Sequence, residues 1–312
     1  FYGCSNLQSI NVNSYNNNYI SENGILFNKE KTELIKFPEG KEDISEYSIP
    51  EGVISIKERA FYQCTNLVKV IIPDSVTTLE YATFDECSNL ESIIIPEGVT
   101  TIETMAFSRC ISLKNIILPL SVTKIGSQAF YDCSDLKSIV IPENVGTIES
   151  EAFEHCDNLI IYTKSDTKGH KYAEENGQRY IIDNEGPEIT FEPNGSENPQ
   201  KGYSVKVGVA DNQEEVGVKD ISLKYQWTQS ETEPTKESFT ESFENGQTIT
   251  KSTGDGKWYL WIYAEDNLEN ETITKSEAFN FDNTAPIINI EYSTKEITED
   301  PVIVTITSNE EI

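Results

Sequence analysis

The chain has 312 residues, a length that usually corresponds to about two or three domains. It carries 53 acidic and 24 basic residues, which gives a net charge of −29 at pH 7. A polyanion of this size repels nucleic acids and anionic membrane surfaces, so neither is expected as a partner. No uninterrupted apolar stretch reaches the roughly 18–20 residues that a membrane span needs, so we expect no membrane insertion of this segment.

The first half of the chain is dominated by a repeat of 23 residues. Five consecutive copies begin at Ile49, Ile72, Ile95, Leu118 and Ile141. One column of the alignment holds Phe61, Phe84, Phe107, Phe130 and Phe153, another Cys64, Cys87, Cys110, Cys133 and Cys156, and a third Leu67, Leu90, Leu113, Leu136 and Leu159. A unit this short cannot bury its own apolar face, whereas stacked copies turn each column into a continuous internal ladder. The repeat therefore predicts a solenoid with these three columns inside.

Each copy contains one short strand pattern, "LxxIxI". In the copy with Leu136, Ile139 and Ile141, these side chains are expected to point inward from a short parallel strand. The proline that follows cannot donate to the ladder and is expected to end the strand. The "AF" pair is expected on the opposite wall, in a looser turn or a short helix. Residues such as Ile94 would then face outward.

Both ends of the repeat region depart from the pattern. The chain opens with "FYGC", which falls inside a repeat unit, so we expect the natural chain to begin before Phe1. Residues Gly24–Phe37 alternate around a polar turn and predict a β-hairpin. Residues Asp166–Asp183 predict a helix with Asp166 near its N-cap and Gly177 just past its end, and then a final strand. Such an end would cap the open layer of a solenoid.

The unit "IPxxVxxIxxxAFxxCxxLxxI" resembles the BspA-type leucine-rich repeat of bacterial surface proteins. The resemblance covers about Phe1 to Asp183 and includes the hairpin interruption and the "YAxExG" terminal helix. It implies a curved solenoid, a secreted or cell-surface location, and attachment to other proteins or host surfaces. It does not imply catalysis.

The cysteine column raises the question of disulfides. Neighbouring copies in a parallel stack lie about 4.8 Å apart, which a disulfide tolerates. However, in-register side chains are parallel, whereas a disulfide needs a dihedral angle near 90° across its sulfurs. We therefore expect reduced thiols that pack as small apolar residues. Zinc is less expected still, because its ligands gather around a point and not along a line.

After Asp183 the chain reads as alternating strands separated by turns. Three segments place apolar side chains on one face: Tyr203, Val205, Val207 and Val209; Ile221, Leu223, Tyr225 and Trp227; and Trp258, Leu260, Ile262 and Ala264. Several short strands in about 100 residues predict an antiparallel sandwich.

A second internal repeat has an offset of 99 residues, which pairs Pro187 with Pro286 and Val205 with Val304. The "YAEDN…FDNTAP" pattern resembles bacterial immunoglobulin-like domains, which occur in tandem as stalks. The predicted fold is mainly β: a leucine-rich-repeat solenoid over residues 1–183, an immunoglobulin-like sandwich over 184–283, and an incomplete second sandwich over 284–312. We expect the natural chain to continue beyond this point, because two strands do not form a stable sandwich.

The residues that usually carry chemistry form no recognisable motif. His155 and His170 are the two histidines, neither lies in a catalytic arrangement, and there is no Gly-rich phosphate loop. No catalytic residue, cofactor or metal is predicted. Calcium remains an alternative, since Asp211, Glu265, Asp266 and Asp282 lie at predicted strand ends or in the linker, where oxygen ligands could converge. Against it, the chain has no DxDxDG-type loop, and acids at strand ends are usually solvated.

Two surfaces are candidates for binding a partner. The first is an outward column of the solenoid sheet, made of Lys69, Ile71, Ser92, Ile94, Asn115, Ile117, Ser138 and Val140. Exposed aliphatic side chains in a row indicate a contact surface, although β-branched residues also simply favour strands. The second is the outward aromatic row Tyr259, Trp261 and Tyr263, which could stack on sugars or bind protein. A neighbouring strand or the solenoid could equally cover that row.

We therefore expect a non-enzymatic, secreted or cell-surface protein that binds an extracellular protein or glycan through its solenoid. The immunoglobulin-like region would act as a spacer. Two alternatives remain: a purely structural surface stalk, and a non-catalytic glycan-binding arm of a larger extracellular enzyme.

Overall fold

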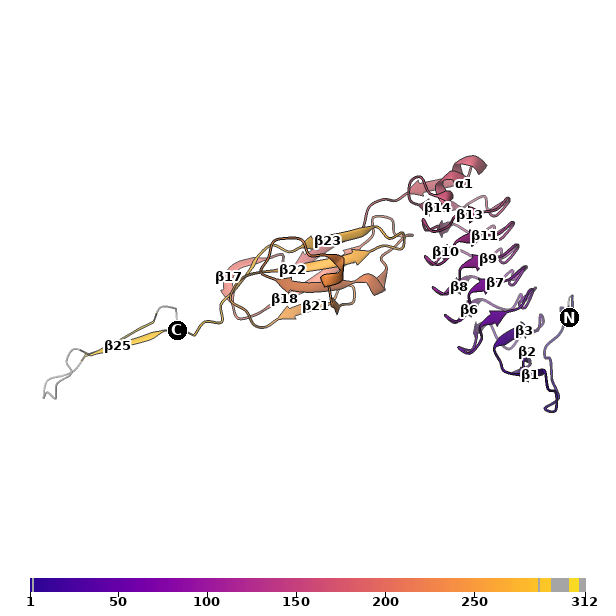
Figure 1. Cartoon of the computed structure of the whole chain (residues 1–312), viewed down its shortest axis with the longest axis horizontal. Coiled ribbons are helices and arrows are strands. Elements are labelled where there is room, and N and C mark those ends of the chain that lie inside the picture. Colours follow the sequence, from indigo (N-terminus) through magenta and orange to yellow (C-terminus); the bar gives the residue numbers. More distant parts are fainter. Residues whose placement is uncertain (2, 286, 293–302, 309–312) are drawn as a thin grey trace. The chain divides into compact units, whose positions relative to one another are not determined.

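Figure 1 shows the computed structural model, which describes residues 1, 3–285, 287–292 and 303–308. The chain divides into two compact units. The first comprises Phe1–Glu188 together with two later segments, Ala210–Lys219 and Ala264–Thr272. The second comprises Ile189–Val209, Asp220–Tyr263 and Ile273–Ile312. No helix among the described residues is long and apolar enough to cross a membrane.

The first unit is built on a solenoid, as predicted. The "LxxIxI" segments form parallel strands in two sheets, together with one strand before the copies and one in the cap. The first sheet holds β4 (Glu46–Ser48), β6 (Lys69–Ile71) and β8 (Ser92–Ile94), and the second holds β10 (Asn115–Ile117), β12 (Ser138–Val140), β14 (Ile160–Thr163) and β15 (Arg179–Ile182). The register follows the repeat, since Lys69 pairs with Ser92 and Asn115 with Ser138. We call these two sheets together the long-strand wall.

A second ladder, which the pattern analysis did not predict, lies on another wall of the solenoid. It consists of β1 (Tyr19–Glu22), β2 (Ile25–Asn28), β3 (Glu33–Lys36), β5 (Ser55–Ile56), β7 (Thr78–Leu79), β9 (Thr101–Ile102), β11 (Lys124–Ile125) and β13 (Thr147–Ile148). From β3 onward its strands are parallel. Each coil of the solenoid therefore contributes to two ladders (Figure 1).

The "AF" wall consists of turns that are hydrogen-bonded from coil to coil. The amides of Arg59, Phe61 and Gln63 donate to carbonyls of the next coil at 2.9–3.0 Å. Arg59 and Gln63 have φ angles of 54° and 56°, and the equivalent residues of later coils are also left-handed. Left-handed backbone is unusual outside glycine. Its recurrence here, together with these bonds, shows that the turns pair with their neighbours as regularly as the strands do.

The phenylalanine column forms the centre of the core, which confirms the prediction. Its five members are each 0% exposed, and adjacent rings stack with centroids 4.9–5.4 Å apart. Phe37 continues the stack before Phe61 at 5.4 Å, and Tyr172 closes it with an edge contact to Phe153 at 5.6 Å. Both ends of the aromatic column are therefore covered by residues from outside the regular copies.

The six cysteines, all in the described part of the chain, are free thiols, five buried and Cys4 exposed. The buried thiols donate to the carbonyl of a phenylalanine in the preceding coil. Cys87 contacts the Phe61 carbonyl at 3.0 Å, and Cys110 contacts that of Phe84 at 3.2 Å. The buried cysteines are thus reduced and packed in the core, as expected, and each thiol also contacts a backbone carbonyl.

The two ends of the repeat region match their predictions with one shift. Strands β2 and β3 form the predicted antiparallel hairpin. Helix α1 (Lys168–Asn176) is capped at its start by Thr167, whose side chain accepts from the His170 amide, so the N-cap lies one residue after Asp166. Gly177 ends the helix with a φ of 66°. Strand β15 then pairs in parallel with β14 and completes the cap.

The second unit contains mainly antiparallel sheets that are consistent with a sandwich. One sheet has the order β16 (Glu188–Glu192), β18 (Tyr203–Ala210) and β21 (Thr248–Lys251). The other has the order β17 (Ser196–Gln200), β24 (Phe279–Phe281), β22 (Gly256–Glu265), β19 (Lys224–Thr228) and β20 (Glu241–Ser242), with β23 (Glu271–Lys275) beside β22. The predicted inward face of β18 is buried, and the Tyr203 ring packs 4.8 Å from the Phe279 ring. Its assignment as an immunoglobulin-like domain stays a prediction.

One prediction of side-chain direction in this unit is wrong, and the second candidate binding surface proves to be buried. Ile221 is 82% exposed because it lies in a short 3-10 helix, η1 (Asp220–Ser222), and not in strand β19. Tyr259, Trp261 and Tyr263 are buried, at 6%, 4% and 1% exposure. They form a second apolar cluster with Phe239, which follows the 3-10 helix η2 (Lys236–Ser238). The aromatic row faces away from the sandwich core, as expected, but an adjacent segment covers it.

The last described residues form a two-stranded antiparallel hairpin, β25 (Ile288–Tyr292) and β26 (Val304–Ser308), in which Ile290 pairs with Ile306. Both of these isoleucines are exposed. Pro286, which the 99-residue repeat pairs with Pro187, lies outside the described residues. That this hairpin begins a second sandwich stays a prediction.

Candidate functional site

The predicted outward column exists on strands β6, β8 and β10. Ile71, Ile94 and Ile117 are 38%, 54% and 45% exposed. Beside them, Ser92 and Asn115 are exposed and Lys69 is half-buried. The intervening residues Val70, Ile93 and Ile116 are buried, as strand alternation requires. We call the three exposed isoleucines the open column.

The last two members predicted for this column are not exposed. Ser138 and Val140 on β12 are 5% and 0% exposed, so that part of the prediction is wrong. Val140 lies in an apolar cluster with Tyr162, Val216 and Leu268. Val216 and Leu268 belong to the segments Ala210–Lys219 and Ala264–Thr272 of the same unit, which we call the covering loops. The long-strand wall thus continues beneath them with the same kind of apolar side chain.

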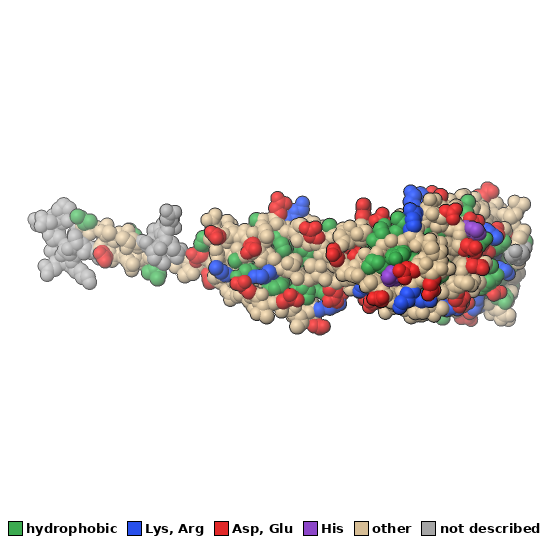
Figure 2. Space-filling view, turned by 90° about the horizontal axis from the view of Figure 1, so that it is seen from above, with side chains coloured by type: hydrophobic (Ala, Val, Ile, Leu, Met, Phe, Trp, Pro, Cys, Tyr) green, Lys and Arg blue, Asp and Glu red, His purple; other side chains and the backbone are tan. Residues whose placement is uncertain are grey.

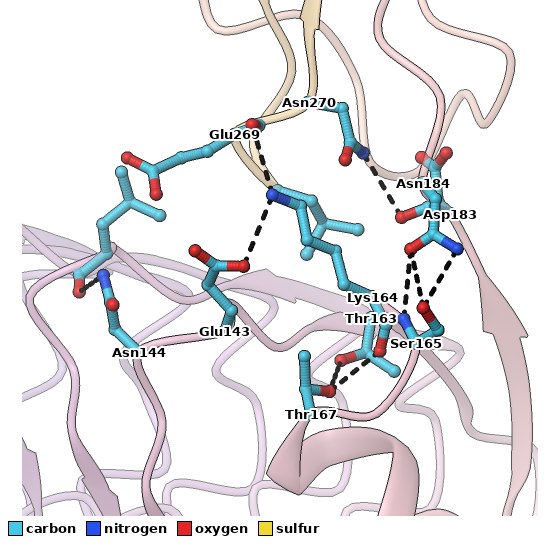
Figure 3. Close-up of polar contacts among 12 residues, drawn as sticks. Glu143, Asn144, Thr163, Lys164, Ser165, Thr167, Asp183, Asn184, Glu269 and Asn270 are labelled. Carbon is cyan, nitrogen blue, oxygen red and sulfur yellow. Dashed lines mark hydrogen bonds and ion pairs between the residues drawn. The ribbon is translucent and has the colours of Figure 1, made fainter.

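Polar contacts hold the second covering loop against the solenoid cap (Figure 3). The Lys164 ammonium donates to the Glu269 carbonyl at 3.2 Å and lies 3.5 Å from the Glu143 carboxylate. The Asn270 side-chain amide donates to the backbone carbonyl of Asp183 at 3.3 Å. The loop is therefore attached by both apolar and polar contacts.

The long-strand wall is interrupted in the middle of the open column. Strands β8 and β10, both fully described, belong to separate sheets. A groove of about 340 Å³ lies at this interruption, lined by residues that include Ile94, Ile117 and Pro119. A larger groove of about 780 Å³ follows, lined by residues that include Ile117, Ile160, Tyr162, Arg179 and Glu215. The open column is therefore not a flat surface, and a partner's side chains could enter it at two places.

Of the four candidate calcium ligands, the fold brings only Asp211 and Asp266 close together. Asp211 and Asp266 lie in one cluster with Asp183, and one carboxylate oxygen from each residue lies within 4.8 Å of the other two. Glu265 instead faces Lys219 at 3.7 Å, and Asp282 accepts the Thr284 amide at 3.0 Å.

Asp183 was not among the predicted ligands. The signal was present, because the 99-residue offset that pairs Pro187 with Pro286 also pairs Asp183 with Asp282. The sequence could not show which member of that pair approaches Asp211, since the contact depends on how the covering loops pack.

The three carboxylates of this acidic cluster are strongly desolvated. Asp183 and Asp266 are 2% and 0% exposed. Burial raises the pKa of each, and the nearby carboxylate charges raise it further. Burial also raises the pKa of Asp211 to about 6, to which Asp183 and Asp266 contribute. Three like charges in so small a volume disfavour one another unless a proton or a cation is shared.

The histidines take packing and surface roles, in line with the prediction. The His155 ring meets the edge of Tyr131 with centroids 5.0 Å apart. His170 accepts the Asp166 amide through Nδ1 at 3.1 Å, which fixes its ring at the start of α1.

The fold defines this chain as a leucine-rich-repeat solenoid protein with additional β structure. A family model described as the BspA type leucine-rich repeat region matches residues 1–48 and 39–160, in six copies. This match covers about half of the chain, and the protein belongs to the BspA-type leucine-rich repeat family.

Similar solved structures include leucine-rich repeat proteins from bacteria. A leucine-rich cell surface protein from Faecalibacterium prausnitzii is 32% identical over 55% of this chain and 46% of its own, with a TM-score of 0.50. A leucine-rich repeat protein from Bacteroides ovatus is 30% identical over 49% of this chain and 40% of its own, with a TM-score of 0.43. The pneumococcal vaccine antigen PcpA is 22% identical over 56% of this chain and 50% of its own, with a TM-score of 0.49. This chain thus spans half or less of the length of these proteins, and no curated protein matches it.

Proposed function

We propose that this chain is a non-enzymatic recognition module of a bacterial surface protein, and that its open column binds an extracellular protein. The observation that carries the proposal is the contrast along one wall of the solenoid. Val140 is covered by two apolar loop residues of the same unit, whereas Ile71, Ile94 and Ile117 remain exposed. A wall that already binds Val216 and Leu268 at one end has suitable chemistry for a partner's apolar side chains further along.

The surroundings of the open column favour a protein partner. Exposed apolar side chains rimmed by polar residues are typical of protein-binding surfaces. Ser92 and Asn115 supply a neutral polar rim, and Lys114 is paired with Glu91 at 2.6 Å. The face drawn in Figure 2 shows acidic side chains scattered over both units, with basic ones interspersed. With a net charge of −29, the protein favours a partner that is neutral or basic at its edges.

The membership of the family and the named cell-surface relative support a surface location. The burial of Tyr259, Trp261 and Tyr263 leaves this aromatic row unavailable for stacking on sugars, which favours the open column as the binding surface. The second unit would serve as a spacer.

The test compares two substitutions by a charged residue. The whole chain is immobilised and its binding to a panel of purified extracellular matrix proteins and to a glycan array is measured. Ile94→Glu should abolish binding to a protein ligand, because a carboxylate would enter an apolar contact. Ile221→Glu, at a position of the second unit that is 82% exposed, should leave binding unchanged.

Circular dichroism of both variants checks that the fold is retained. Equal binding by both variants would exclude the open column. Binding to glycans alone would support the alternative of a glycan-binding arm, and the absence of any ligand would support a structural stalk.

A further inference from the structure

We propose that Asp183, Asp211 and Asp266 form a binding site for one calcium ion, which fastens the covering loops to the end of the solenoid. The three residues are far apart in sequence but belong to the same compact unit. Asp183 follows strand β15, Asp211 lies in the first covering loop, and Asp266 lies in the second. One ion would therefore join three separate segments.

The distances fit a calcium ion. Calcium–oxygen bonds of about 2.3–2.6 Å place two ligand oxygens at most about 4.6–5.2 Å apart. One oxygen from each aspartate lies within 4.8 Å of the other two, which is within this limit. A ligand set of carboxylates alone is typical of hard cations such as Ca²⁺ and not of zinc, which binds sulfur and nitrogen more often.

Two of the carboxylates have an oxygen for which the described residues provide no hydrogen bond. Asp183 Oδ1 accepts the Glu185 amide at 3.2 Å, but its Oδ2 is buried and has no hydrogen-bond partner. Asp211 Oδ1 accepts the Gln213 amide at 2.7 Å, and its Oδ2 is likewise buried without one. A buried carboxylate oxygen without a partner is unfavourable, because nothing replaces the hydrogen bonds to water that it loses. Since Asp183 is only 2% exposed, bulk water does not solvate this oxygen.

The third carboxylate is held rigidly. Asp266 Oδ1 accepts the amides of Leu268 and Asn270 at 2.7 and 2.8 Å, and Oδ2 accepts the Asn270 side chain at 2.7 Å. These bonds orient the carboxylate through the residues that follow it. Metal ligands are commonly fixed in this way by hydrogen bonds from a second layer of residues.

The basic residue that acts on the cluster is already engaged. Lys164 lowers the pKa of Asp183 electrostatically, but its ammonium donates to the Glu269 carbonyl and pairs with Glu143. Because Lys164 is engaged elsewhere, it does not balance the negative charge of the three aspartates. A divalent cation would neutralise that charge. The competing explanation is that the cluster shares protons and binds no metal, so the experiment has to separate the two.

Binding would have a structural consequence. Val216 lies five residues after Asp211, and Leu268 lies two residues after Asp266. An ion that fixes the two aspartates relative to Asp183 would hold both apolar residues on Val140 and Tyr162. We therefore expect calcium to protect the covering loops from local opening.

The test uses the whole chain after treatment with a chelator and dialysis. Isothermal titration with CaCl₂ should show one saturable site, in or below the range of about 10⁻⁴–10⁻³ M found for extracellular calcium modules. Hydrogen exchange should slow in peptides covering residues 210–219 and 264–272 when calcium is added. MgCl₂ should produce a weaker effect, because magnesium demands near-ideal octahedral geometry at shorter distances.

The decisive variant is Asp211→Asn. Its Oδ2 has no hydrogen-bond partner, so the substitution breaks no bond at that atom. It should abolish both the titration heat and the calcium-dependent protection. Asp282→Asn is the matched control, because Asp282 lies outside the cluster and its retained Oδ1 can still accept the Thr284 amide.

If the wild-type chain shows neither heat nor protection at about 10 mM calcium, well above the range for extracellular modules, the proposal is overturned. Binding that Asp211→Asn retains would overturn it equally. Should Asp211→Asn fail to fold, the wild-type titration and exchange measurements still decide between the two explanations.

Discussion

The rings of Phe84 and Phe107 lie 5.4 Å apart with an angle of only 4° between their planes. They come from equivalent positions of successive coils, so each ring packs on the same ring of the next copy. The rings are stacked nearly parallel, and the column continues in this way through the repeats. Because each coil contacts only its neighbours, the loss of one ring affects two interfaces.

Truncation of a central ring should therefore destabilise the solenoid strongly. We expect Phe107→Ala to lower the free energy of unfolding by about 3–5 kcal/mol, because it leaves a cavity in a fully buried stack. Urea denaturation followed by circular dichroism measures the change. Phe107→Leu keeps most of the volume and should cost clearly less. A change below about 0.5 kcal/mol for the alanine variant, the size of an ordinary surface substitution, would contradict the stack as the main core element.

The five buried cysteines of the repeat should not react with thiol reagents in the folded protein. Burial raises the pKa of Cys87 to about 12 and that of Cys110 well above its ordinary value, and the thiolate is the reactive form. A hydrogen bond with Cys133 lowers the pKa of Cys156, but its thiol is only 1% exposed and a reagent cannot reach it. An aromatic disulfide reagent should label Cys4, the exposed thiol, and no other in the native chain. In denaturant all six should react. Fewer than six in denaturant would reveal a disulfide, and several fast native reactions would show that the column is open.

The buried carboxylate of Asp85 should destabilise the fold at neutral pH. Asp85 is 7% exposed, and burial raises its pKa above the ordinary value. An aspartate whose folded-state pKa is raised binds its proton more tightly in the folded state, so stability falls as pH rises through the window between the two pKa values. Asp85→Asn should therefore raise the urea midpoint at pH 7.

This advantage should shrink as the pH is lowered through the raised pKa and should vanish near the ordinary aspartate value of about 3.9. Measuring both proteins at several pH values isolates Asp85 from the other carboxylates, which the two chains share. An advantage that does not depend on pH would show that charge is not its cause.

Leu268 should control local opening of the covering loops. It is 0% exposed and lies in the cluster with Val140 and Tyr162. Leu268→Ala should speed hydrogen exchange in residues 210–219 and 264–272 and expose Val140, while peptides around Phe107 remain protected. Ile221→Ala, at an exposed position, is the control. Equal acceleration throughout the chain would mean that the loops and the solenoid open together.

The repeat columns could be predicted because a copy of 23 residues restricts each side chain to one place in every coil. Burial of Phe84, Cys87 and Leu90 follows from that restriction alone. The open column on Ile71, Ile94 and Ile117 could be predicted for the same reason, since strand alternation turns it outward. The second ladder was missed because its strands, such as β9 (Thr101–Ile102), are too short to show alternation.

The repeat did not show which outward-facing positions of the solenoid are covered by segments from further along the chain. Val140 occupies the same repeat position as Ile117, yet one is buried and the other open, because Val216 and Leu268 pack on only one of them. The sequence likewise left open whether the aromatic row at Tyr259 is covered, and Phe239 covers it from a segment with no repeat.

By itself, the sequence determined the solenoid, its internal columns and the direction of the side chains on the strands of the long-strand wall. These properties depend on contacts between equivalent residues of adjacent copies, which the repeat makes visible. Only the tertiary structure decided how much of the outer wall stays free and that Asp183 joins Asp211 and Asp266. Those contacts form between segments far apart in the chain that share no period, so no local pattern records them.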